Sequence, residues 1–277
     1  MPLTTRPLVI YHSPCADGFS AAWCFWKRYA SNAQYVEGRY SEAPLDVTDR
    51  DVYLVDFSYK RDVVIEMVKV ARSVTLIDHH KSALLDLQDI DGLNYFCDLN
   101  HSGAMLAWKF LFGDNKAPTL LHYVEDRDLW RFRLIGSREV SAALFSYEYE
   151  FSTWDILMDE SLTSIESLTS AGKSISRKHD KDIRELIKFG KRFLEIGGHT
   201  VPVVNLPYTM SSEAGHILAQ EAPFAASYMD GENYRFFSLR SKEGGLDVSA
   251  IATSYGGGGH PHAAGFRVAR DHILACN

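Results

Sequence analysis

Three short apolar runs in the first 80 residues are each followed directly by polar, chemically reactive side chains. The runs are 8–11, 52–55 and 74–77, and their length and β-branched residues predict buried strands. Apolar residues at helical spacing follow in 19–29 and in 63–71. Strands that alternate with helices predict an α/β fold with a mainly parallel sheet and helices on both faces.

The pattern changes beyond residue 100. Residues 102–111 and 119–124 have the spacing of helices, and a charged stretch from 173 onward, with apolar residues at helical intervals, predicts an exposed linker helix. Short strand candidates at 201–204, 224–228 and 234–239 predict a smaller C-terminal α/β domain. We therefore expect three parts: an N-terminal domain over 1–172, a linker helix over 173–195 and a C-terminal domain over 196–277.

Composition narrows the class of protein. The chain has 277 residues and a net charge of −7, which argues against a large nonspecific surface for long duplex DNA but not against short anionic ligands bound together with cations. The sequence has no apolar run of about 18 residues and no signal-peptide pattern, so no membrane association is expected. The cysteines form no CxxC pair, which predicts free thiols and a cytoplasmic protein; they are Cys15, Cys24, Cys97 and Cys276.

Carboxylates and imidazoles gather where the predicted strands end. A single aspartate there is most often a helix cap, but the carboxyl ends of parallel strands meet at one edge of a sheet. Such groups need cations to neutralise them, and a mixed oxygen and nitrogen set favours Mn²⁺, Mg²⁺ or Fe²⁺. The sequence therefore predicts a metal site, and a pair of ions suited to phosphoryl hydrolysis is consistent with the number of candidates. The candidates are His12, Asp17, Asp56, Asp78, His79, His80 and Asp126.

The motifs resemble those of a known family. Asp78-His79-His80 after a strand, together with His12, Asp17-Gly18 and Asp56, resembles the DHH phosphoesterases, and the glycine-rich segment 256–266 is similar to the motif of their DHHA1 domain. The motifs lie between residues 8 and 268, nearly the whole chain. The resemblance implies a DHH catalytic domain, a linker helix and a DHHA1 substrate-binding domain.

The resemblance also implies roles for single residues. Two ions, usually Mn²⁺, would be held by His12, Asp17, Asp56, His79 and Asp126. Asp126 is preferred to its neighbour Asp128 because the family has an aromatic residue four positions after this ligand, as Trp130 is here. Asp78 would orient His79, and His80 would contact the scissile phosphate.

One position departs from the family pattern. The first loop of the family commonly carries two aspartates separated by one residue, and here that pair is Cys15-Ala-Asp17. Cys15 is either a thiolate ligand to the metal or a spectator.

The C-terminal glycine run suggests an anion site. Glycines allow backbone N–H groups to approach a phosphate, and an arginine offers a forked pair of donors; a flexible turn is the alternative. The resemblance assigns substrate binding to Arg240, Gly257, Gly258, Gly259 and His260, with His101 as an additional candidate.

These features predict a metal-dependent phosphodiesterase or exonuclease that hydrolyses short oligonucleotides, such as small RNA fragments or linear dinucleotides. A phosphatase acting on 3′-phosphoadenosine 5′-phosphate and a cyclic-dinucleotide phosphodiesterase are alternatives. A catalytically impaired nucleotide-binding module is the alternative from a different class, favoured only by Cys15 at an expected aspartate position. The expected partners are short single-stranded oligonucleotides or small phosphorylated nucleotides. The prediction also allows a homodimer.

Overall fold

The chain divides into two compact units, which are described separately. The computed structural model describes residues 6–39 and 44–276. Its units are Met1–Ser176 and Arg177–Asn277.

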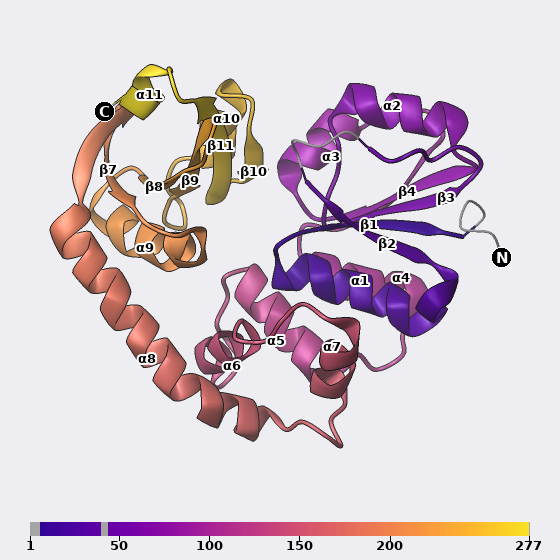
Figure 1. The fold of residues 1–277 in the computed structure, drawn as a ribbon. Helices are drawn as coiled ribbons and strands as arrows, with labels where there is room; N and C mark the ends of the chain where they lie inside the picture. Colours follow the sequence, from indigo (N-terminus) through magenta and orange to yellow (C-terminus); the bar gives the residue numbers. More distant parts are fainter. Residues whose placement is uncertain (1–5, 40–43, 277) are drawn as a thin grey trace. The chain divides into compact units, whose positions relative to one another are not determined.

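The first unit contains a five-stranded sheet in which every strand pair is parallel (Figure 1). The strand order is β2-β1-β3-β4-β5, which confirms the predicted parallel α/β architecture. The three predicted strands form the centre, and the edge strands β2 and β5 were not predicted because their polar, partly exposed residues weaken the apolar signal. The strands are β1 (Leu8–His12), β2 (Gln34–Gly38), β3 (Asp51–Val55), β4 (Ser73–Asp78) and β5 (Leu93–Cys97).

Helices cover both faces of this sheet. Figure 1 shows α1 (Ala16–Tyr29) and α4 (Gly103–Phe112) below the strands and α2 (Arg61–Val70) and α3 (Lys81–Leu87) above them. Successive strand side chains point to opposite faces, so that Val9 packs in the core with α1 and α4 while Ile10 packs in the core with α2 and α3. The central strands are buried on both sides, as their continuous apolar runs predict.

Three further helices extend the core on the α1 side: α5 (Thr119–Asp128), α6 (Ser137–Leu144) and α7 (Phe151–Met158). Trp154 of α7 is fully buried and donates a hydrogen bond from Nε1 to Ser20 Oγ at 3.0 Å. The indole therefore ties α7 to α1, the helix that carries Asp17.

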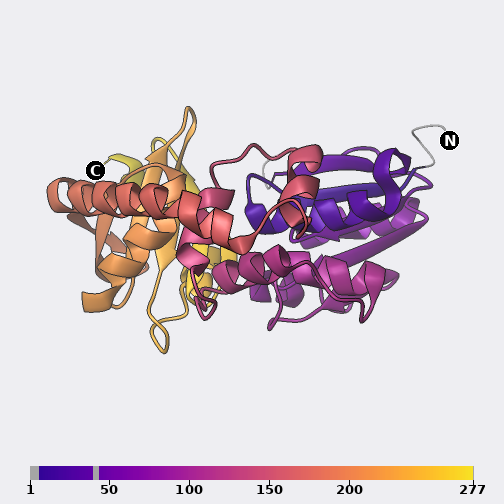
Figure 2. The ribbon, with the colours of Figure 1, turned by 90° about the horizontal axis from the view of Figure 1, so that it is seen from below.

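The long helix α8 corrects the predicted linker. It spans Ile165–Gly190, seen as one continuous helix in Figure 2, and residues 192–196 are a strand instead of its continuation. Ile183 on its C-terminal half is fully buried and packs with Val204 and Leu206. Most residues of this half of α8 are exposed, and Ile183 is the buried residue through which it contributes to the core of the second unit.

The second unit is a six-stranded mixed sheet with helices, as predicted for a smaller α/β domain. The strand order is β10-β11-β9-β8-β7-β6, antiparallel except between β7 and β8. Its strands are β6 (Arg192–Ile196), β7 (His199–Asn205), β8 (Ala225–Asp230), β9 (Tyr234–Arg240), β10 (Gly258–His260) and β11 (Ala263–Ala269). Its helices are α9 (Ser211–Leu218), α10 (Val248–Ser254) and α11 (Ile273–Cys276), and short 3₁₀ turns in the chain are η2 (Ala30–Asn32), η3 (Tyr208–Met210) and η4 (Ala219–Glu221).

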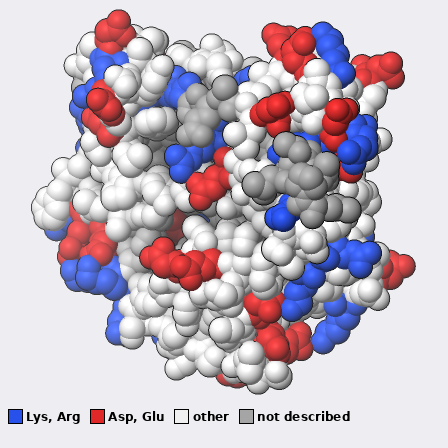
Figure 3. Space-filling model, turned by 45° about the vertical axis from the view of Figure 1, so that its right-hand side comes forward, with Lys and Arg blue, Asp and Glu red and all other residues white. Residues whose placement is uncertain are grey.

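The surface charges and the free cysteines agree with what the composition predicts. On the face shown in Figure 3, acidic and basic side chains are interspersed. All four cysteines are free. Among the residues that the structure describes, no helix is long and apolar enough to cross a membrane.

Candidate metal centre

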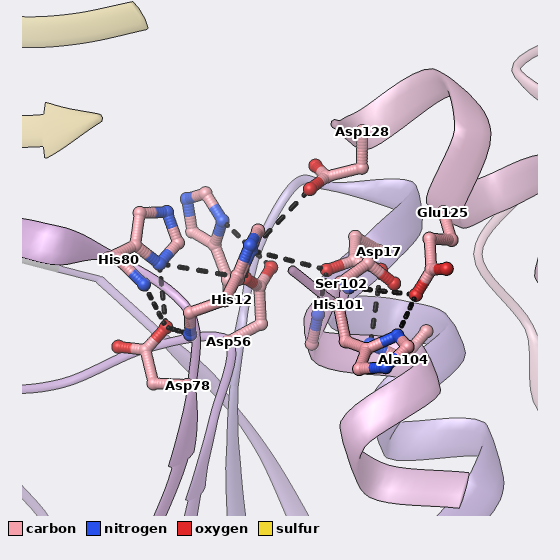
Figure 4. Close-up of polar contacts among 12 residues, drawn as sticks. His12, Asp17, Asp56, Asp78, His80, His101, Ser102, Ala104, Glu125 and Asp128 are labelled. Carbon is pink, nitrogen blue, oxygen red and sulfur yellow. Dashed lines mark hydrogen bonds and ion pairs between the residues drawn. The ribbon is translucent and has the colours of Figure 1, made fainter. Parts of the chain in front are cut away.

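The ends of β1, β3 and β4 lie level with one another. Tyr11 pairs with Val55, and Val55 pairs with Ile77, so the next residues, His12, Asp56 and Asp78, come together at one edge of the sheet. Figure 4 shows their side chains gathered above the strand ends. Asp56 has a φ of +52°, a left-handed conformation that aspartate tolerates better than most residues. The parallel topology therefore assembles the cluster from distant segments of the chain.

Asp56 is the centre of the cluster. Its side chain is 2% exposed; Oδ1 lies 3.1 Å from His79 Nε2, and Oδ2 lies 3.4 Å from His12 Nδ1. The two oxygens of one carboxylate thus face two different donor groups. One group is His12, Cys15 and Asp56, and another is Asp17, His79 and Asp128; the potential ligand atoms within each group lie within 4.8 Å of one another.

Asp17 is held by the start of helix α4. Its Oδ2 accepts a hydrogen bond from the Gly103 backbone N–H at 2.6 Å, and its Oδ1 accepts one from Ala104 at 3.1 Å. The helix N-terminus also favours negative charge at this place. Gly103 allows the approach, because an added Cβ would lie 2.5 Å from Asp56 Cβ. Gly103 is thus a positioning residue that sequence reasoning noted only as part of a helix start.

Asp128 occupies the place that was predicted for Asp126. Asp128 Oδ2 lies 3.5 Å from His79 Nε2, and Figure 4 shows this carboxylate pointing toward the histidines. The carboxylate of Asp126 instead accepts hydrogen bonds from the backbone N–H groups of Arg133 and Leu134 at 2.9 and 3.1 Å. Residues two apart on an α-helix project about 200° apart, so only one of the pair can face the cluster. Asp126 fixes the loop after α5.

Asp78 serves the two histidines differently from the prediction. Its Oδ1 accepts the backbone N–H of His79 at 2.7 Å and contacts His80 Nδ1 at 2.7 Å. The carboxylate expected to orient the His79 ring therefore orients the His80 ring, while Asp56 contacts the His79 ring.

The protonation of the cluster fits a site for cations. Burial and the neighbouring Asp128 and Asp56 raise the pKa of Asp17 well above its ordinary value, and burial also raises the pKa of Asp128. Burial would lower the pKa of His79, but Asp128, Asp56 and Asp17 outweigh it and raise that pKa to about 11. Burial would raise the pKa of Asp56, but hydrogen bonds with His12 and His79 lower it. The three buried or half-buried carboxylates of Asp17, Asp56 and Asp128 thus share one protonated imidazole, that of His79.

A buried acceptor points to the same conclusion. Asp128 Oδ2 has no hydrogen-bond partner within the described part of the chain, although burying a carboxylate oxygen without a hydrogen bond is costly. Oxygen and nitrogen donors of this kind suit divalent cations such as Mn²⁺ and Mg²⁺. The residues present therefore fit a divalent metal centre.

Cys15 lies inside the cluster and His101 lies beside it. Burial raises the pKa of the Cys15 thiol, while a hydrogen bond to His12 lowers it. The ring of His101 contacts Glu125 Oε2 through Nδ1 at 3.0 Å and Lys109 Nζ through Nε2 at 2.6 Å. Both ring nitrogens of His101 therefore contact these side chains, which leaves its predicted role as a substrate contact without support.

The glycine run differs from the expected phosphate cradle. The Gly256 N–H donates to Thr253 O and the Gly257 N–H donates to Ala252 O, both at 2.9 Å, and Gly256 has a φ of +80°. This is the paired hydrogen bonding that ends a helix at a left-handed glycine. The Gly257 amide predicted to bind an anion therefore caps α10. Gly258, Gly259 and His260 form the edge strand β10.

Arg240 and His260 remain together in the second unit. Each pairs with Ala263, Arg240 from β9 and His260 from β10. Directly opposed residues point to the same face of a sheet, so the two basic side chains flank a small alanine across about 10 Å, two strand spacings. Arg240 Nη2 also donates to Ser212 Oγ at 2.9 Å, which steadies the guanidinium beside α9.

Comparison with solved structures identifies the fold. The DHH domain of a protein described as belonging to a family of ribosomal proteins has a TM-score of 0.51 at 12% identity, covering 96% of this chain and 83% of that one. The chain has the fold of the DHH domain. A pGpG-specific phosphodiesterase, PggH from Vibrio cholerae, also has a TM-score of 0.51, at 16% identity over 96% of this chain and 94% of that one.

Sequence comparison adds one relative of undescribed activity. The uncharacterized protein R106 of Acanthamoeba polyphaga mimivirus is 29% identical over 283 aligned positions, which cover 93% of this chain. The chain spans 66% of that protein's length, slightly under two thirds. No protein-family model matches the chain.

Proposed function

We propose that the chain is a metal-dependent phosphodiesterase that hydrolyses short oligonucleotides, with linear dinucleotides as its smallest substrates. The observation that carries the proposal is the position of Asp56, whose two carboxylate oxygens face two donor groups at one sheet edge. A carboxylate shared in this way suits a pair of divalent cations, Mn²⁺ first and Mg²⁺ or Fe²⁺ next. The phosphodiesterase from Vibrio cholerae with this fold is described as pGpG-specific, so pGpG is the first substrate to test.

Each side chain then has a role in the reaction. Divalent cations in such a site, when bound, supply a hydroxide nucleophile at neutral pH and neutralise phosphate charge. We assign His12, Asp17, Asp56, His79 and Asp128 to holding them. His80 contacts the scissile phosphate; its ring is fixed through Nδ1 by Asp78 and its side chain is 17% exposed at the edge of the cluster.

The second unit supplies binding, in this proposal, through the basic row of Arg240 and His260. An arginine fork suits a phosphate oxygen pair, and the alanine between the two basic residues leaves room for a small anionic group. The net charge of −7 disfavours tracking along a long polymer, because such grooves are basic. Short substrates therefore fit better than long ones.

A hydrolysis panel tests the proposal. The metal-free protein is loaded with Mn²⁺ and offered pGpG, a 5-mer, a 24-mer, a cyclic dinucleotide and 3′-phosphoadenosine 5′-phosphate, each repeated with EDTA. We expect cleavage of pGpG and the 5-mer that EDTA abolishes. Preference for the cyclic dinucleotide or the bisphosphorylated nucleoside would replace the proposed substrate with one of these.

Variants give the panel its control. His79→Ala should lower turnover at least about 100-fold, the upper end of the losses recorded for outer-shell partners of metals. The control is His179→Ala on α8, which should leave turnover unchanged. The ring of His179 lies 3.9 Å from Glu213. Folded protein that binds Mn²⁺ and nucleotides but cleaves nothing would refute the enzyme and favour a nucleotide-binding module.

A further inference from the structure

Cys15 stands at a helix N-cap position but does not make the side-chain hydrogen bond that N-cap residues usually make. It is the N-cap residue of helix α1, with an extended backbone at φ −152° and ψ 135°, and its side chain makes no capping hydrogen bond. Serine, threonine, aspartate and asparagine are preferred at such positions because their oxygens accept from the first turn. Helix capping therefore does not explain a thiol here.

The thiol instead lies among metal-ligand atoms. Cys15 Sγ, a ring nitrogen of His12 and a carboxylate oxygen of Asp56 lie within 4.8 Å of one another. His12 Nδ1 and Asp56 Oδ2 are 3.4 Å apart, and the Asp56 side chain is 2% exposed. Nitrogen, sulfur and oxygen donors from two strand ends and one helix start thus face a common point.

The second donor group has a different chemistry. Asp17, His79 and Asp128 offer two carboxylates and one imidazole without sulfur. Thiolate and imidazole ligands favour borderline or soft cations such as Zn²⁺, Co²⁺ and Fe²⁺, whereas carboxylates favour Mn²⁺ and Mg²⁺. Asp56 faces both groups, so its carboxylate lies between two metal positions that prefer different cations.

We propose, on the basis of the metal centre proposed above, that Cys15 is a metal ligand and that the His12–Cys15–Asp56 position selects a borderline cation such as Zn²⁺, Co²⁺ or Fe²⁺. The Asp17–His79–Asp128 position then takes Mn²⁺ or Mg²⁺. The centre is a mixed one, with different ions at its two positions. Binding at the first position releases the thiol proton to the buffer.

Cobalt spectroscopy tests the sulfur ligand without an activity assay. Metal-free protein is titrated with Co²⁺ under anaerobic conditions, and thiolate-to-cobalt charge transfer is followed in the near ultraviolet. We expect the band in the wild type and in Cys276→Ser, a control at an exposed thiol, and its loss in Cys15→Ser. Cys15→Ser should fold normally because serine is a preferred N-cap residue, and circular dichroism checks this.

Metal preference gives a second readout. Competition titrations with Zn²⁺ and Mn²⁺ should show that Cys15→Ser loses Zn²⁺ affinity at least about tenfold, the lower end of the losses recorded even for outer-shell partners. Cys15→Asp should shift the preference of the same position toward Mn²⁺. An unchanged ratio of affinities in both variants would overturn the selectivity.

The outcomes separate the two proposals. Stoichiometric Co²⁺ binding to the wild type without the band, or an equal band in Cys15→Ser, would overturn the role of Cys15. If pGpG hydrolysis with Mn²⁺ and its loss in His79→Ala persist in that case, the phosphodiesterase stands alone. If the wild type binds neither Co²⁺ nor Mn²⁺, the proposed metal centre fails together with Cys15.

Discussion

Replacing Gly103 by alanine tests whether the close approach of α4 positions the carboxylates of the metal centre. A Cβ at this position would lie 2.5 Å from Asp56 Cβ and 2.9 Å from Asp17 Oδ2. Ordinary contact begins at 3.4 Å, so restoring it takes a movement of Asp56 or of the start of α4 by 3.4 − 2.5 = 0.9 Å. The same movement disturbs the 2.6 Å hydrogen bond from the Gly103 N–H to Asp17.

The expected effect is large on activity and small on stability. Overpacking costs about 1–3 kcal/mol, and the better helix propensity of alanine offsets about 1 kcal/mol. The free energy of unfolding of Gly103→Ala should therefore fall by about 0–2 kcal/mol relative to the wild type. A displacement of about 1 Å in a reacting site costs about 100-fold in rate, so kcat/KM should fall by about that factor.

Initial rates of pGpG hydrolysis at saturating Mn²⁺, together with thermal melts, measure both effects. Gly190→Ala is the matched control, because its added Cβ would lie 3.5 Å from Val204 Cγ2, an ordinary contact. Near wild-type kcat/KM in folded Gly103→Ala would refute the argument that this approach sets the geometry. A melt lowered far beyond the expected range would show that Gly103 serves the fold more than the site.

Three further predictions concern other parts of the chain. Asp128→Asn should abolish Mn²⁺-dependent turnover while Asp126→Ala mainly lowers the free energy of unfolding, by about 1–3 kcal/mol; the reverse result in rates and melts would restore Asp126 as the ligand. Arg240→Ala should raise KM with little change in kcat, as expected for lost ground-state binding, and steady-state kinetics showing a change only in kcat would contradict this. A hydrogen bond from Arg235 lowers the pKa of Asp230 from its ordinary 3.8, so its stabilisation is present above that pH and is lost as the pH falls through the lowered pKa. Wild type should therefore melt above Asp230→Asn at pH 7 and lose this advantage as the pH falls below 3.8 and through the lowered pKa, whereas a constant difference across that range would refute the linkage.

Local patterns in the sequence predicted the part of the site that depends on strand ends. Continuous apolar runs identify strands buried on both faces, and parallel pairing places their carboxyl ends at one edge. The sequence alone therefore predicts that His12, Asp56 and Asp78 lie together, since each terminates or directly follows such a run. The edge strands β2 and β5 lacked this signal because they are only partly buried.

The sequence by itself thus determined the α/β class, the central strands and the residue types at their ends. The tertiary structure decided which of two nearby candidates faces the site. Asp126 and Asp128 share one helix, and the packing of α5 turns Asp128 toward His79 and Asp126 toward the following loop. The tertiary structure likewise decided the role of the Gly257 N–H, which ends α10 by donating a hydrogen bond to Ala252 O. Side-chain direction and hydrogen-bond partners depend on segments distant in sequence, which local periodicity does not contain.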